Sequence, residues 1–187
     1  MFGEQMIKSL MDLATYYHEL SPVKVAVFRD LGKLSIGEST ELLSKGVEAT
    51  IPFWLAELLS KDGSVEIKEN TLETRDVAMA LISEKGSGER DFTKLKPSFY
   101  PEARRLLSKV REASLKEPEA AVSLIKLESN LDDLIQYRLR KLTKIAVLSR
   151  EEEADEYIDK VLIEEAVFLK TLKALISEWR WAVSGRK

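Results

Sequence analysis

Residues 118–146 read PEAAVSLIKLESNLDDLIQYRLRKLTKIA, and this stretch decides the fold. Its apolar residues recur at intervals of three and four, which is the spacing of one face of an α-helix. Those residues are Leu124, Leu127, Leu131, Leu134, Ile135, Leu142 and Ile145. A proline is tolerated in the first turn of a helix, where its missing N–H is not needed. The stretch therefore predicts a long helix that starts at Pro118.

The sequence before this stretch predicts two more helices. Asn70 and Glu73 have the spacing of a capping pair, and they start a helix that ends at Gly86-Ser87-Gly88. We interpret that glycine pair as a flexible connection. Pro101 precedes an apolar pattern through Val110 that predicts the next helix.

The sequence after the long helix predicts a last helix. Ser149 and Glu152 have the spacing of a capping box, and the acids 151–153 suit the positive end of a helix dipole, so we expect the helix to start there. Its apolar residues between Val161 and Ile176 cover more than one face. Either the chain's own helices or a neighbouring chain must cover them, and we favour the second. The predicted subunit interface consists of Phe168, Leu172, Ile176, Trp179, Leu131, Leu134 and Leu142.

The first 69 residues follow a different pattern, in which short strands alternate with helices. A helix is expected over residues 2–20, and alternation predicts strands at 23–27 and 65–67. One extended segment is expected through 42–51, followed by a short helix over 53–59 that Pro52 begins. The sequence thus predicts a mainly α chain, with a small N-terminal α+β domain over 1–69 and a C-terminal helical bundle domain over 70–187.

The composition limits the classes of function. Hydrophobic residues make up 44% of the chain and charged residues 33%, which is typical of a globular protein with a charged surface. The sequence contains no cysteine, which excludes disulfides, zinc–cysteine sites and thiol catalysis. A net charge of −3 disfavours nucleic-acid binding by the whole surface. Without a transmembrane or signal segment, we expect a cytoplasmic or nucleoid location and no membrane contact.

Candidate catalytic residues are scarce. His18 is the single histidine, and we expect it to have a structural role at a helix end. Asp132, Asp133 and Glu128 are adjacent or nearly so on a helix, so they point in different directions and predict a solvated or salt-bridged face. No serine lies in the G-x-S-x-G setting of a nucleophile elbow, and Gly86-Ser87-Gly88 lacks the following lysine of a phosphate-binding loop. We therefore predict a non-catalytic protein with no metal and no cofactor.

Two features could mark a binding surface. Basic residues on the predicted helix after Pro101 and on the long helix from Pro118 could form a nucleic-acid surface, although such charges more often are solvated or pair with nearby acids. They are Arg104, Arg105, Lys109 and Arg111, with Arg138, Arg140, Lys141 and Lys144. Trp179 and Trp181 point to different sides of their helix, so we expect one in the core and the other at an interface.

Three segments resemble subunits of the GINS family. GVEATIPFWLAELLSKDGSVEI at 46–67 is similar to their small β-rich domain, with a Val-Glu-x-x-x-Pro-x-Trp-Leu-Ala pattern. KLKPSFYPEARRLL at 94–107 resembles the entry to their helical domain, and DLIQYRLRKLTKIA at 133–146 resembles a helix with an Asp-x-x-x-x-Arg-x-x-Lys-Leu pattern. The matching motif positions are Pro52, Trp54, Leu55, Asp133, Arg138 and Lys141. The domain order is like that of the archaeal subunit related to the eukaryotic Psf-two and Psf-three proteins.

The resemblance implies a subunit that scaffolds and activates the MCM helicase at the replication fork. It implies a tetramer of two copies of this chain with two copies of a sister subunit whose helical domain comes first. The implied partners are MCM, a RecJ-like protein, and in archaea also primase and DNA polymerases, while direct DNA contact stays open. Two other readings remain: a stand-alone nucleic-acid-binding or regulatory protein, and a small hydrolase or transferase.

Overall fold

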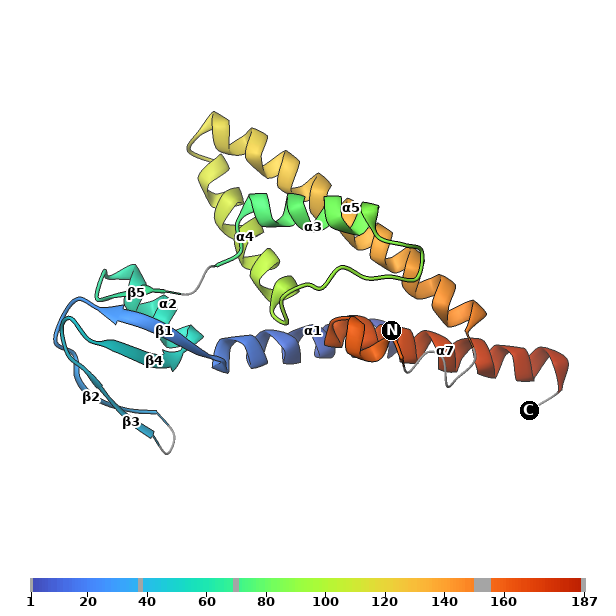
Figure 1. Ribbon diagram of the computed structural model, residues 1–187, viewed down its shortest axis with the longest axis horizontal. Helices are drawn as coiled ribbons and strands as arrows, with labels where there is room; N and C mark the ends of the chain where they lie inside the picture. The colour runs from blue at the N-terminus through green and yellow to red at the C-terminus, as the bar shows by residue number, and fades with distance from the viewer. Residues whose placement is uncertain (1, 37–38, 69–70, 150–155, 186–187) are drawn as a thin grey trace. The chain divides into compact units, whose positions relative to one another are not determined.

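The computed structural model describes residues 2–36, 39–68, 71–149 and 156–185 (Figure 1). The chain is mainly helical with a small α+β part, which confirms the predicted fold class. It divides into two compact units, Met1–Thr71 and Leu72–Lys187. Across the described ranges, no helix has the length and apolar character needed to cross a membrane.

The first unit contains helix α1 (Phe2–Leu20), strands β1 (Pro22–Val27), β2 (Gly32–Ile36), β3 (Ser39–Leu43) and β4 (Glu48–Pro52), helix α2 (Phe53–Lys61) and strand β5 (Val65–Ile67). β1 lies between β4 and β5 and pairs antiparallel with both, while β2 and β3 form a separate antiparallel hairpin. The alternating valines of β1, Val23, Val25 and Val27, are buried in one core with Phe53 and Leu55 of α2. The period of two in this strand therefore decides which face meets the helix.

The prediction of one extended segment over 42–51 is wrong in detail. The chain turns after β3, where Gly46 has a φ of +83° and its N–H donates to the carbonyl of Val27 at 2.8 Å. A positive φ is accessible to glycine because it lacks a Cβ. β3 and β4 are therefore separate strands, and β2 is a further strand that was not predicted.

The second unit contains α3 (Thr74–Gly86), α4 (Phe99–Ser114), α5 (Pro118–Leu148), a short 3-10 helix (Ile158–Lys160) and α7 (Ile163–Ser184). The long α5 is its central element, as Figure 1 shows. Its N-terminal and middle turns pack with α3 and α4 around Leu127, Leu131 and Leu134. Its last turns pack with α7 around Leu142 and Ile145. Pro118 begins α5, as predicted.

Two predicted helix starts are corrected. Asn70 lies outside the described residues, and the first turn of α3 is capped instead by Asp76, whose Oδ2 accepts the N–H of Glu73 at 2.9 Å. Ser149 does not begin the last helix; its N–H donates to Ile145 at the end of α5. Residues 151–153 lie outside the described ranges, and α7 begins at Ile163. Glu165 supplies its cap by accepting the N–H of Leu162 at 2.9 Å, as in the second half of a capping box.

Candidate functional site

A buried network of charged side chains joins three helices of the second unit. Arg138 of α5 donates from Nε to Glu165 Oε1 at 2.5 Å and from Nη2 to Glu165 Oε2 at 2.6 Å. Its Nη1 donates to Glu84 Oε2 at 2.8 Å and to the carbonyl of Thr93 at 3.1 Å. Because Glu84 lies on α3 and Glu165 on α7, one guanidinium connects both helices to α5.

Lys141, one turn further along α5, binds the segment that follows α3. Its Nζ donates to Glu84 Oε1 and to Ser87 Oγ, each at 2.6 Å, and to the carbonyl of Asp91 at 2.9 Å. The Phe92 ring lies 5.9 Å from this ammonium and 5.1 Å from the Arg138 guanidinium, within range of a cation–π interaction. Ser87 is thus anchored, which corrects the interpretation of residues 86–88 as a flexible connection.

The network is balanced in charge and nearly saturated with hydrogen bonds. Glu165 Oε1 also accepts the Tyr100 hydroxyl at 2.6 Å. Burial and the negative charge of Glu165 raise the pKa of Tyr100, so its hydroxyl stays protonated and donates. Burial alone would lower the pKa of Arg138, but Glu165, Tyr100 and Glu84 raise it above its ordinary value. Two cations and two carboxylates neutralise each other, so the arrangement serves to position helices.

Glu84, Glu165 and Tyr100 were not predicted from the sequence. A signal for the first two exists, because Glu84 continues the buried positions Val77 and Leu81 of α3 at helical spacing. Glu165 likewise precedes the buried Leu169 by four residues. On α5, Arg138 and Lys141 fill the gap in the apolar pattern between Leu134 and Leu142. Charged residues at core positions of packed helices predict buried ion pairs, since an unpaired buried charge is costly.

The positions that carry the family resemblance lie in both units. In the first unit, Leu55 is buried, Pro52 is half-buried at the end of β4, and Trp54 is exposed. In the second, Asp133 Oδ2 pairs with Lys85 Nζ at 3.2 Å, while Arg138 and Lys141 form the network.

Glu128 and Asp132 of α5, and the single histidine, have structural contacts. Glu128 Oε1 pairs with Arg111 Nη2 at 2.7 Å, and Asp132 Oδ2 accepts from Gln136 at 3.0 Å, which confirms a salt-bridged, solvated face. His18 is buried, with its ring 4.5 Å from that of Phe53. Among the residues that the structure describes, no group of three or more histidine, aspartate and glutamate side chains is arranged to hold a metal ion.

The basic residues do not form the single surface that the sequence suggested. Arg138 and Lys141 are buried and neutralised, so they are corrected from candidate nucleic-acid contacts to core residues. Arg104 and Lys109 of α4 are exposed and Arg105 is half-buried. On α5 and α4, the exposed Lys144 and Arg111 pair with Glu89 and Glu128, and Arg140 lies over the Tyr137 ring.

The predicted interface residues fall into two groups. Leu131, Leu134 and Leu142 are buried by the chain's own helices, so they are core residues and do not offer the exposed surface that was predicted. Their apolar stripe meets α3, α4 and α7 of the same unit. The second group lies on α7: Phe168, Leu172 and Ile176 are half-buried, and Trp179 is 65% exposed. Trp181 is also exposed, so neither tryptophan is in the core.

One face of α7 passes from the core into solvent. Its residues recur at intervals of four and three, the spacing of a single helix face. They are Glu165, Leu169, Leu172, Ile176, Trp179 and Val183. The first two are buried, the next two are half-buried, and the last two are 65% and 69% exposed. Figure 1 shows the C-terminal part of α7 continuing beyond the end of α5, which explains why the covering side chains run out.

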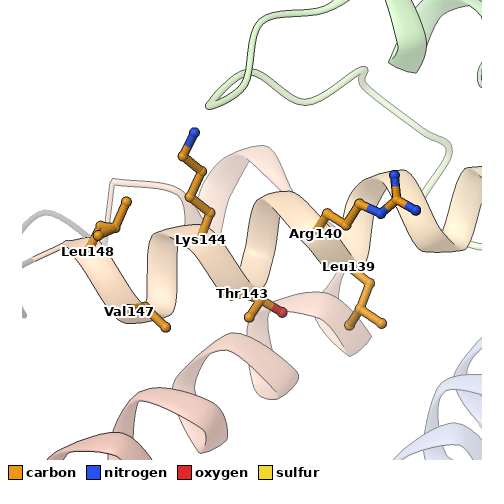
Figure 2. A pocket seen from close by; sticks show the side chains of 6 residues that line it. All are labelled: Leu139, Arg140, Thr143, Lys144, Val147 and Leu148. Atoms are coloured by element: carbon orange, nitrogen blue, oxygen red, sulfur yellow. The ribbon is translucent and has the colours of Figure 1, made fainter.

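A second uncovered surface lies on the outer side of α5. A shallow pocket is lined by Leu139, Arg140, Thr143, Lys144, Val147 and Leu148. Figure 2 shows Leu139, Thr143 and Val147 along one edge of the helix and Arg140, Lys144 and Leu148 along the other. Each set has a spacing of four, so the two sets form parallel ridges with a groove between them. We call this surface the α5 groove; its six lining residues include two cations and no acid.

Comparisons of the sequence with models of known protein families and with curated proteins find no match.

Proposed function

We propose that the chain is a non-catalytic subunit of a GINS-type complex, which scaffolds and activates the MCM helicase at the replication fork. The observation that supports assembly most directly is the α7 face that begins in the core at Glu165 and ends at the exposed Trp179 and Val183. A continuous apolar stripe of this kind is typical of a helix whose face is packed against protein along its whole length. A neighbouring subunit would cover the last turns.

The energetics of this face favour a partner. Removing apolar surface from water stabilises a complex by roughly 25 cal/mol per Å². Tryptophan is also among the residues that contribute most to binding when it is enclosed at the centre of an interface. Trp179 lies in line with Leu172 and Ile176, which are half-buried against the core, so a covering helix could extend the existing packing without a change of direction.

The network supports the replication role through the family resemblance. The Arg and Lys of the Asp-x-x-x-x-Arg-x-x-Lys-Leu pattern are Arg138 and Lys141, which hold α3, α5 and α7 together. A chain with this pattern would need both residues to build the same helical unit. The resemblance therefore includes residues that hold together the helical domain, which is the domain proposed to bind other subunits. The proposed partners are the sister subunit, MCM and the RecJ-like protein.

Co-purification from native cells tests this function. The tagged chain is expected to bring down the sister subunit and MCM, identified by mass spectrometry. Trp179→Glu should remove the sister subunit because it places a charge in the α7 face. Trp181→Glu is the matched control, since Trp181 is exposed on a different side of the same helix. Recovery of neither partner with the unaltered chain, or equal losses with both variants, would contradict the proposal.

A further inference from the structure

Helix α1 carries an uncovered apolar face in the first unit. Leu13, Tyr16, Tyr17 and Leu20 are each between 62% and 76% exposed. Their spacing of i, i+3, i+4 and i+7 places them on one side of the helix. The opposite side of α1 is occupied by His18, which is buried against Phe53 of α2. The exposed face is therefore additional to the contact that holds α1 in its own unit.

We propose that this face of α1 binds the α5 groove of a second copy of the chain. Reciprocal exchange would then produce a symmetric dimer with two identical α1–α5 contacts. The proposal concerns the chain by itself and does not depend on the replication role. It also involves other residues than the α7 face, which remains available to a different subunit.

The geometry of the two surfaces is complementary. The exposed face of α1 has two ridges with a spacing of four, one through Asp12, Tyr16 and Leu20 and one through Leu13 and Tyr17. The α5 groove lies between two ridges of the same spacing. A ridge with a spacing of four fits a groove between two such ridges, which is the commonest way in which helices pack, at a crossing angle of about −50°.

The charges of the two surfaces also match. The α5 groove is edged by Arg140 and by Lys144, which already pairs with the exposed Glu89, and none of its lining residues is an acid. Asp12 and Glu19 lie along one edge of the α1 face, next to Tyr16, and the exposed Lys8 lies one turn before Asp12, so this edge carries two acids and one cation. Another uncovered apolar helix face, at the end of α7, carries one acid, Glu178, and one cation, Arg180, so its charges cancel. The α1 face is thus the better match to a basic groove.

The apolar parts contribute attraction and the charges set the alignment. Leu139, Val147 and Leu148 are 41%, 42% and 58% exposed, so the groove offers apolar surface to the tyrosines and leucines of α1. Thr143, between them, offers a hydroxyl that could pair with a tyrosine hydroxyl of the incoming helix. With Tyr16 between the ridges, Asp12 would approach Arg140 or Lys144 at the basic edge.

A charge-swap experiment on the full-length chain tests the proposal. Analytical ultracentrifugation should show a concentration-dependent equilibrium between monomer and dimer. Asp12→Lys and Arg140→Glu each turn an attraction into a repulsion in both contacts, so each variant alone should have a dissociation constant roughly tenfold higher. In an equimolar mixture, every α1–α5 contact of the mixed dimer again joins opposite charges. Mixing should therefore restore association to near the unaltered level.

The controls separate this contact from others. Lys109→Glu changes an exposed cation of α4 and should leave the dimer intact. Circular dichroism verifies folding, and Lys144→Glu replaces Arg140→Glu in the swap if the latter fails to fold. A chain that stays monomeric at all concentrations would overturn the proposal. That result is expected if the α5 groove binds an acidic helix of another protein and not α1 of a second copy. The proposal would also be overturned if Trp179→Glu dissociated the dimer and the charge variants did not. The same holds if the mixture of the two charge variants associated no better than each variant alone.

Discussion

Arg138 of α5 and Glu165 of α7 form a buried ion pair with two parallel hydrogen bonds, 2.5 Å from Nε to Oε1 and 2.6 Å from Nη2 to Oε2. The planar guanidinium fits a carboxylate in this way, whereas a lysine ammonium would bind as a single point charge. The third nitrogen, Nη1, reaches Glu84. The position of α7 on α5 is thus tied to that of α3 through one side chain.

Arg138→Ala should destabilise the chain by roughly 3–5 kcal/mol, because it leaves buried carboxylates without their main partner. Chemical denaturation followed by helical circular dichroism measures this loss. Lys126→Ala is the matched control on the same helix: its side chain is exposed and lies outside the α5 groove, so the change should stay within about 0.5 kcal/mol. Similar effects of both substitutions would show that the network does not hold the helices.

Acid should weaken the network through Glu84. Burial alone would raise the pKa of Glu84, but hydrogen bonds from Lys141 and the Thr93 N–H, with the charges of Arg138 and Lys141, lower it below the ordinary 4.5. The unfolded chain therefore takes up this proton first as the pH falls. The stability that Glu84 contributes is complete above about pH 4.5 and is lost as the pH falls through the lower folded value.

Denaturation curves between neutral and acidic pH check this dependence. Glu84→Gln should be less stable than the unaltered chain at neutral pH, and the difference should shrink in acid. Glu66→Gln, at an exposed glutamate of β5, should follow the unaltered chain throughout. A difference between Glu84→Gln and the unaltered chain that stayed constant with pH would contradict the expectation.

The contribution of Glu164, which precedes Glu165 of the network, to the stability of the chain should depend on pH in the opposite way. Both of its carboxyl oxygens are buried, and no other residue within the described ranges donates a hydrogen bond to them. Burial, with help from the charge of Glu165, raises the pKa of Glu164 despite its own backbone N–H and Arg104. A raised folded pKa contributes stability that is complete below the ordinary 4.5 and is lost as the pH rises through the folded value.

Glu164→Gln should therefore make the chain more stable than the unaltered protein at neutral pH, because an unpaired buried charge is removed. The two proteins should converge in acid, where Glu164 is protonated. The same denaturation series measures this. Equal stability at neutral pH would indicate that the carboxylate is solvated in solution.

Gly63 and Gly86 both have open space beside the Cα, but replacing each with alanine should change the stability of the chain in opposite directions. Gly63, between α2 and β5, has a φ of +71°. Gly86, the last residue of α3, has a φ outside the left-handed region. At either position a Cβ would meet no atom within 4 Å. Gly63→Ala should cost about 1–2 kcal/mol for the left-handed conformation. Gly86→Ala should stabilise by about 0.4–1 kcal/mol, because it restricts the unfolded chain. Unfolding curves of the full chain compare the two, and equal effects would refute the conformational explanation.

Local sequence patterns predicted much of the fold for a physical reason. The period of three and four in 118–146 and the alternation at 23–27 each have one structural solution that buries the apolar side, and α5 and β1 adopt it. The helix start expected at Ser149 was wrong because α7 begins after Leu162, which has no side chain that could form the first half of a capping box, so the sequence carries only a weak signal there. Which cap is used depends on Glu165 meeting Arg138, a contact between residues 27 positions apart.

The sequence by itself determined a mainly helical chain, the strand that faces α2, and the apolar faces of α5 and α7. Only the tertiary structure decided which of those faces are covered: Leu131, Leu134 and Leu142 are enclosed by the chain, and Trp179 is not. It also decided that Arg138 and Lys141 are core residues, through Glu84 and Glu165. The reason is that periodicity defines a helix face from neighbouring residues, whereas burial and charge pairing depend on which distant helix lies against it.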